Sequence, residues 1–372
     1  MHPPAADTPA ALHGRRGYLD WLRGVAVLIM IEAHTFDSWT RLEDRSRWEY
    51  GWAMILGGFG APVFLFLAGI ALALAAGSRQ RRGVDDGEVV RLALRRGWQI
   101  FGLAFLFRLQ SWVISRGPAR GLLKVDILNV MGLAMLAAAV AWWAGRGTRS
   151  RALIFTGATI AIAMATPLIR ATPALSVLPE PIESYFRSPP GRTTFTLFPW
   201  AGFLVGGAAV GLALDAARTV AAERRAIIGL TGVGLIVALG GYAASFLPPI
   251  YRETSFWTSS PTFFFLRFGI LILALPIAYA WNAAWSGRSP LQEFGVASLF
   301  VYWIHVEMVY GVLSLPLHRA LTLEQVTIAC AAFALGMFAL VQLKARVMKP
   351  RRRPLAAITK TTKTKTLFTS SS

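Results

Sequence analysis

The stretch "DWLRGVAVLIMIEAHTFD", residues 20–37, decides the fold, because it is a membrane-type segment that nevertheless carries charged side chains. Most of its residues are apolar, and a helix of about 20 such residues is long enough to cross a bilayer. The stretch also holds two aspartates, an arginine, a glutamate and a histidine. Ionisable groups are costly inside a bilayer, and those that occur there usually belong to a functional site. The stretch therefore predicts a membrane helix that carries part of a site.

The whole chain has the composition of a polytopic membrane protein. Of its 372 residues, 55% are hydrophobic and only 15% are charged, whereas soluble domains average about 25% charged residues. Apolar runs of about 20 residues recur along the chain. They predict an all-α bundle with ten transmembrane spans, at residues 18–38, 52–76, 98–114, 122–144, 152–171, 194–214, 226–247, 261–281, 292–312 and 324–343.

Arginine and lysine orient this bundle, since short cytoplasmic loops are enriched in them. With the N-terminus inside, the inner segments hold 24 of the 38 Lys and Arg residues, the outer loops hold 10 and the spans hold four. The sequence therefore predicts two cytoplasmic termini: a disordered leader at 1–17, a membrane domain at 18–345 and a basic disordered tail at 346–372. Topology and a tail attracted to anionic lipid account for the net charge of +19, so we expect no nucleic-acid partner.

The cysteine count excludes two kinds of site. Cys330 is the single cysteine and falls within the tenth predicted span. The sequence therefore predicts neither a disulfide framework nor a cysteine metal site, and we expect no bound metal. The oligomeric state is left open.

A polar seam follows one face of the first predicted helix. Arg23 and His34 are eleven positions apart, which on a helix is three turns plus about 20°, or about 16 Å along the axis. Asp20 extends this seam at the inner end and Asp37 at the outer end. Glu32 falls roughly opposite the seam, so we expect it to face another neighbour or the lipid headgroups.

A second histidine is predicted at the same depth. In "SLFVYWIHVEMVYG", residues 298–311, His305 lies about 13 positions into a helix that also rises from inside to outside. His34 reaches a comparable depth on its own helix, so the two histidines are expected to share one layer. His318 falls in an outer loop and is expected on the surface.

Further polar or aromatic side chains fall in the outer half of other predicted spans. Each has an ordinary interpretation alone, since Trp belongs to interfacial belts and Arg can extend to the headgroups. Their common depth instead favours an aqueous cavity that opens to the outer face. The cavity-lining candidates are Arg108, Asp126, Asn129, Trp200 and Arg267.

The chemistry expected of such a cavity is group transfer. A neutral histidine oriented by a carboxylate makes a hydroxyl or an amine nucleophilic near neutral pH, so the catalytic candidates are His34, Asp37 and His305. Arg23 beside Asp20 suits an anionic donor that arrives from the cytoplasm. In the plainer interpretation these two residues only pair and fix the end of the helix. Neither a Gly-rich phosphate loop nor an H-E-x-x-H or serine-elbow motif occurs in the spans.

Five motifs, in order along residues 16 to about 345, resemble those of the transmembrane acyltransferase group, in particular the bacterial relatives of the heparan-alpha-glucosaminide N-acetyltransferase catalytic domain. The motifs are "RGYLDWLRGVAVLIMIEAH", "GAPVFLFLAGIALAL", "VDILNVMGLAMLAA", "FTLFPWAGFLVGGAAVG" and "SLFVYWIHVEMVYG". The Arg23-x10-His34 spacing also matches the membrane acyltransferases that O-acylate cell-surface polysaccharides.

This resemblance implies an acyltransferase of the bacterial cytoplasmic membrane. It implies acyl-CoA, in the first place acetyl-CoA, as the donor bound from the cytoplasm, and a sugar or glycan amine or hydroxyl as the acceptor on the far side. His34 would be the general base or a transient acyl carrier, and Arg23 a donor-binding or structural residue. In the lysosomal enzyme the proposed catalytic histidine lies in the loop between the first two helices. Residues 35–51 contain none here, so the resemblance implies that His34 would have to take its place, as in the polysaccharide acyltransferases.

Two other functions remain open from the residues alone. A transporter or flippase would use the same histidines and aspartates to relay protons or to bind substrate. A non-catalytic scaffold would have no need of a polar seam. The proline-rich outer loop 172–196 is expected to cover the acceptor entrance.

Overall fold

The computed structural model describes residues 16–115, 118–188, 195–285, 287 and 289–348. Most of the predicted leader and tail therefore lies outside the described residues. The described part forms helices and loops, with one isolated bridge between Thr40 and Leu321. Its α-helices are α1 (Gly17–Trp39), α2 (Trp48–Gly57), α3 (Gly60–Arg81), α4 (Asp86–Ser115), α5 (Ile127–Ala144), α6 (Gly147–Ala171), α7 (Glu180–Glu183), α8 (Leu197–Ala216), α9 (Val220–Ala244), α10 (Pro261–Ala284), α11 (Pro290–Val296), α12 (Ser298–Tyr310) and α13 (Leu323–Val347).

Seven segments of the described chain are long and apolar enough to cross a membrane. They are Trp48–Arg81, Ala119–Ala144, Gly147–Ala171, Leu197–Ala216, Val220–Ala244, Pro261–Ala284 and Leu323–Val347. All ten predicted spans coincide with helical residues, but α1, α4 and the α11–α12 pair are not among these seven. The all-α membrane fold is confirmed, whereas the count of ten spans is not. In α1 the reason is its charged side chains, those of the polar seam together with Glu32, which exceed what such a segment normally carries.

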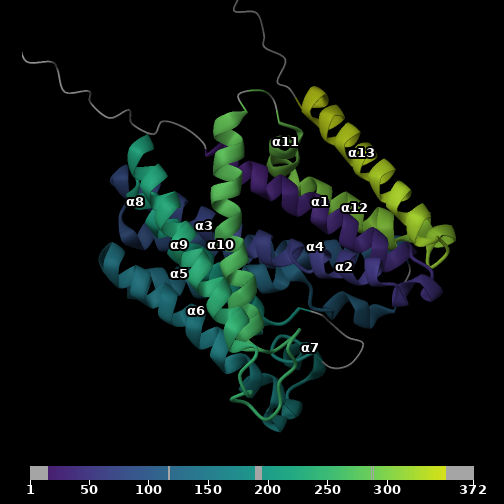
Figure 1. Ribbon diagram of the computed structural model, residues 1–372, viewed down its shortest axis with the longest axis horizontal. Coiled ribbons are helices and arrows are strands. Elements are labelled where there is room, and N and C mark those ends of the chain that lie inside the picture. Colours follow the sequence, from purple (N-terminus) through teal and green to yellow (C-terminus); the bar gives the residue numbers. More distant parts are fainter. Residues whose placement is uncertain (1–15, 116–117, 189–194, 286, 288, 349–372) are drawn as a thin grey trace, which may run out of the picture.

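The ninth predicted span, 292–312, is two helices rather than one. α11 ends at Val296, α12 begins at Ser298, and Ala297 between them leaves the helical conformation with φ −94° and ψ 10°. α11 lies directly against the start of α1, because Gly24 and Gly295 leave room for the facing backbone. A Cβ at either glycine would collide with a carbonyl oxygen of the other helix. The break lets α11 make this contact while α12 follows the later part of α1 (Figure 1).

α1 is the central element of the arrangement. It contacts α2, α3, α10, α11, α12 and α13, while α3 packs on α8, α9 on α10, and α4 on α5. Figure 1 shows α13 on the outer side of α1 and α12, away from the α5, α6 and α8 group. A helix at this position can present one face to a shared interior, which is where the polar seam lies.

Side-chain contacts fix two of the helix ends. Asp126 caps α5 in a capping box with Asn129: its side chain accepts from the backbone N–H of Leu128 at 2.8 Å, and the Asn129 side chain accepts from the Asp126 N–H at 3.0 Å. Asp44, in the short η1 helix (Leu42–Ser46), accepts from the N–H of Leu323 at 2.9 Å and so ties this loop to the start of α13.

Candidate active site

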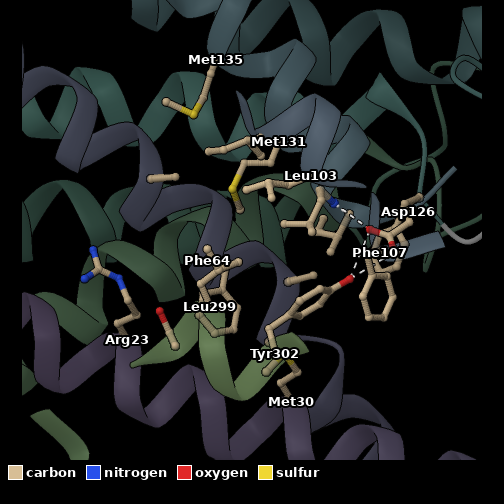
Figure 2. Close-up of a pocket in the computed structure, with 18 of the residues that line it drawn as sticks. Arg23, Met30, Phe64, Leu103, Phe107, Asp126, Met131, Met135, Leu299 and Tyr302 are labelled. Carbon is tan, nitrogen blue, oxygen red and sulfur yellow. Dashed lines mark hydrogen bonds between the residues drawn. The ribbon is translucent and has the colours of Figure 1, made fainter. Parts of the chain in front are cut away.

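One large cavity, of about 1420 Å³, runs along α1 through the bundle. Four arginines line one end, which we call the basic end: Arg23, Arg79, Arg95 and Arg96. The other end, which we call the histidine end, is lined by His34, Asp37 and Tyr310. Apolar side chains separate the two. Figure 2 shows Phe64 and Leu299 between Arg23 on one side and Tyr302 and Asp126 on the other.

The two histidines of the predicted layer contact each other directly. Nδ1 of His34 lies 2.9 Å from Nε2 of His305, and the two rings are parallel within 3°. Nδ1 of His305 lies 2.8 Å from the carbonyl oxygen of Val301, one turn earlier on α12. His34 lines the cavity and is half-buried, whereas His305 is fully buried behind it.

This chain of contacts fixes the tautomers of the neutral imidazoles. A carbonyl oxygen only accepts, so Nδ1 of His305 carries the proton and its Nε2 is an acceptor. Nδ1 of His34 must then donate to that Nε2. The remaining nitrogen of His34, Nε2, is left with a lone pair on the ring that lines the cavity. A histidine held in this way is prepared to take a proton.

Asp37 lines the cavity but does not orient His34. Its carboxylate accepts from the Tyr310 hydroxyl at 2.9 Å and lies 4.0 Å from the Arg45 guanidinium. No hydrogen bond joins Asp37 to His34 in the described part of the chain. The orienting group is His305 instead, and the Tyr310 ring packs edge-on against His34 with centroids 5.4 Å apart.

The five residues predicted to line a cavity divide into two groups. Arg108, Asp126 and Trp200 line it, and Arg108 pairs with Asp126 at 3.2 Å. Tyr302 donates to both Asp126 oxygens, at 3.1 and 3.2 Å. Asn129 and Arg267 do not line it. A residue's depth is a poor guide to the direction of its side chain, which is why these two differ from expectation.

Asn129 is buried in the α5 cap, and Arg267 turns to a smaller cavity on the other side of Trp200. Of the two residues at the N-terminal end of the seam, Arg23 lines the large cavity. Asp20 is buried and pairs with Arg23 at 2.9 Å without lining that cavity. The donor-binding and the structural interpretations of this pair therefore both have a geometric basis.

Sequence reasoning missed most of the basic end. The count of Lys and Arg in the predicted cytoplasmic segments included Arg79, Arg95 and Arg96 only as loop charges. α4 begins at Asp86, twelve positions before the predicted span, so Arg95 and Arg96 lie on the helix that lines the cavity. No ion pair to these three arginines occurs among the residues that the structure describes. Continued helix periodicity upstream of residue 98 was the signal that would have found Arg95 and Arg96.

Of three other polar residues, Glu32 agrees with expectation, whereas His318 and Glu307 do not. Glu32 does face away from the large cavity, toward Gly57 of α2, and its Oε2 is buried with no hydrogen-bond partner in the described chain. His318 is half-buried rather than on the surface, with Nε2 3.4 Å from the Val309 carbonyl oxygen. Glu307 lines the cavity and was not predicted. No group of three or more His, Cys, Asp or Glu side chains suited to a metal occurs in the described residues.

Comparison with known proteins gives the family. Residues 15–240, more than half of the chain, match the family model described as heparan-alpha-glucosaminide N-acetyltransferase, catalytic. Among the curated proteins, none matches the chain at a significant level. The matched part contains His34 and the whole basic end, whereas His305 lies beyond it. The resemblance drawn from the motifs is thus confirmed, and the chain belongs to the heparan-alpha-glucosaminide N-acetyltransferase catalytic-domain family, a family of membrane acetyltransferases.

Proposed function

We propose that this protein transfers an acyl group, in the first place acetyl, from acyl-CoA to an amine or hydroxyl of a sugar or glycan on the opposite side of the membrane. The observation that carries this proposal is the single cavity that joins four arginines to the lone-pair nitrogen of His34. The arginines suit an anionic donor and the imidazole suits proton removal from an acceptor. One cavity can then bring both substrates together.

The basic end is the proposed donor site. The nucleotide part of acyl-CoA carries several phosphate charges, and planar guanidinium groups bind phosphate with paired hydrogen bonds. The guanidinium groups of Arg79, Arg95 and Arg96 are available to bind phosphate, because no acidic side chain pairs with them in the described chain. The apolar middle of the cavity, lined by Met30, Phe64, Leu103, Met131 and Leu299, suits the uncharged arm that carries the thioester.

His34 is the proposed general base. Its Nε2 takes the proton of the acceptor amine or hydroxyl as that atom attacks the thioester carbonyl carbon. The new C–N or C–O bond forms, the C–S bond breaks, and the proton passes to the departing thiolate to give free CoA thiol. General-base catalysis of this kind contributes about 10²–10⁴-fold to the rate. His305 acts as a positioning residue, because it holds the proton of His34 on Nδ1.

The arrangement across the membrane is part of the same proposal. The distribution of Lys and Arg supports an orientation with both termini and the basic end in the cytoplasm and the histidine end outside. We further propose ten spans, with α1, α4 and the α11–α12 pair as the additional three, in a bacterial cytoplasmic membrane. The outer segment 172–196 is proposed to cover the acceptor entrance. It contains α7, and Phe195 at its end lines the cavity, while residues 189–194 lie outside the described part.

Calorimetry with the purified protein in detergent tests the proposal. Acetyl-CoA should bind wild type and His34→Ala with similar affinity, while only wild type should release CoA thiol with glucosamine as the probe acceptor. Absence of acetyl-CoA binding to a folded wild type would contradict the donor assignment. It would favour a transporter, for which a cavity reaching from one end of α1 to the other is equally suited.

A further inference from the structure

Two arginines share a second, small cavity beside the first. Arg170, near the end of α6, and Arg267, in the first half of α10, line a space of about 70 Å³ that we call the arginine pocket. Trp200 lines both this pocket and the large cavity, so the two are neighbours. One water molecule needs about 10–15 Å³ of such space. The arginine pocket is therefore large enough for several waters or for one small polyatomic ion.

Neutral groups hold the Arg170 guanidinium in place. Its Nε donates to the Phe198 carbonyl oxygen at 3.2 Å, and Nη2 donates to Oγ1 of Thr196 at 2.8 Å. The partial negative charge at the C-terminal end of α6 offsets a fraction of its charge. Neither bond supplies a counter-ion.

Arg267 is held in a similar way. It donates to the carbonyl oxygen of Gly58, and its guanidinium lies 5.4 Å from the Phe59 ring centroid and 4.6 Å from that of Phe263. Its Nε is buried, without a hydrogen-bond partner among the described residues. Aromatic faces attract a cation but leave its hydrogen-bond donors unused.

The two guanidinium groups lack the acidic partner that other interior arginines have. Arg108 pairs with Asp126 at 3.2 Å and Arg151 with Asp86 at 2.8 Å. Within the part of the chain that the structure describes, no acidic side chain forms an ion pair with Arg170 or Arg267. Two partly buried cations that share one small cavity are costly unless an anion joins them.

We propose that the arginine pocket binds one oxyanion group, a carboxylate, sulfate or phosphate. Arg170 and Arg267 both line the pocket, together with Thr258 and Ser260. The guanidinium fork matches oxygens of this kind. Trp200 lines both the pocket and the large cavity, so a bound anion lies beside the large cavity. It is then either a charged group of the acceptor or the headgroup of a lipid.

Sulfate binding to the purified protein is the test, measured by calorimetry at constant ionic strength with chloride as the balancing anion. Arg170→Gln and Arg267→Gln should each weaken sulfate binding at least ten-fold. Arg252→Gln is the matched control, because Arg252 is an exposed arginine of the loop before α10 that does not line the pocket. Equal sulfate affinity in all four proteins, or no sulfate binding to folded wild type, would overturn the proposal.

Further variants and competition experiments guard against misfolding and identify the source of the anion. Should Arg267→Gln fail to fold for want of its bond to Gly58, Arg267→Lys and Arg170→Gln still test the pocket. Displacement of sulfate by glucuronate but not by glucose would assign the anion to a sugar acceptor, and displacement by phosphatidylglycerol but not by phosphatidylcholine would assign it to lipid. His34→Ala should keep sulfate affinity, which separates this site from the proposed acyl transfer.

Discussion

The two ends of the large cavity hold their functional groups in different ways. At the histidine end the protein itself satisfies the key side chain: His305 accepts from His34, and Val301 accepts from His305. At the basic end Arg23 is paired with Asp20, but Arg79, Arg95 and Arg96 have no acidic partner in the described chain. A base must be oriented before the reaction, whereas a site for an anion can leave its charges for the ligand to pair. The contrast agrees with the proposed division into a preorganised reaction end and a ligand-dependent binding end.

The largest effect is expected from loss of the base. His34→Ala should lower the transfer rate by about 10²–10⁴-fold, because no other lone-pair nitrogen lines that end among the described residues. Its affinity for acetyl-CoA should stay close to wild type, since the basic end is untouched. CoA-thiol release and calorimetry on the same preparation measure both. His318→Ala is the control histidine, and a folded His34→Ala protein with full turnover would remove His34 from the reaction.

A smaller effect is expected from loss of the positioning contact. His305→Ala leaves Nδ1 of His34 without its acceptor, so the orientation of the base is lost while the base remains. We expect kcat to fall about 10–100-fold with an unchanged KM for acetyl-CoA, since a hydrogen bond of this kind is worth about 1.5–3 kcal/mol at most.

His305→Gln, which can offer an amide oxygen to His34, should recover part of that loss. The pH–rate profile should change its shape in His305→Ala and return toward wild type in His305→Gln. Equal activity of His305→Ala and wild type would mean that the histidine end is not preorganised by this pair.

Substitutions at the basic end should change the affinity for acetyl-CoA rather than the turnover rate. Arg95→Ala and Arg96→Ala should each raise the Kd for acetyl-CoA about ten-fold, the loss expected of one charge-assisted hydrogen bond. Turnover at saturating donor should change little. Arg91→Ala is the control: Arg91 lies one turn before Arg95 on α4, pairs with Glu88 and does not line the cavity. Unchanged donor affinity in both variants would move the donor site elsewhere.

The smallest effect is expected where Asp44 ties η1 to the start of α13. Hydrogen bonding from Arg41 lowers the pKa of the Asp44 carboxyl, and the Leu323 N–H contributes in the same direction. A carboxyl with a lowered pKa in the folded state stabilises that state above its unfolded pKa, about 3.9, and loses the contribution as the pH falls through the folded value. Asp44→Asn should therefore reduce the unfolding temperature slightly at pH 7.

The difference between wild type and Asp44→Asn should vanish in acid, once Asp44 is protonated. Melting curves between pH 7 and about pH 3 would follow this convergence. A difference that grew as the pH fell would have the wrong sign for a carboxylate stabilised by Arg41, and the tie between η1 and α13 would need another explanation.

Much of the fold could be predicted because membrane helices are encoded locally. Long apolar runs, arginine-rich inner segments and the motifs between residues 16 and 345 need no knowledge of neighbours. The helical rise from the inner end of each span likewise predicted one shared layer for His34 and His305, which the structure confirms. The ninth span was wrongly predicted as one helix, because the break at Ala297 accompanies the contact of Gly24 with Gly295, which lie far apart in sequence.

By itself, the sequence determined the membrane class, the family and the residue types of the histidine end, because these follow from composition, periodicity and motif order. Only the tertiary structure decided what each side chain does there. It set the tautomer of His34 through a partner 271 positions away, gathered Arg79, Arg95 and Arg96 at one end, and turned Arg267 out of the large cavity. Hydrogen bonds and counter-charges depend on distances between helices, and no pattern within a single helix contains those distances.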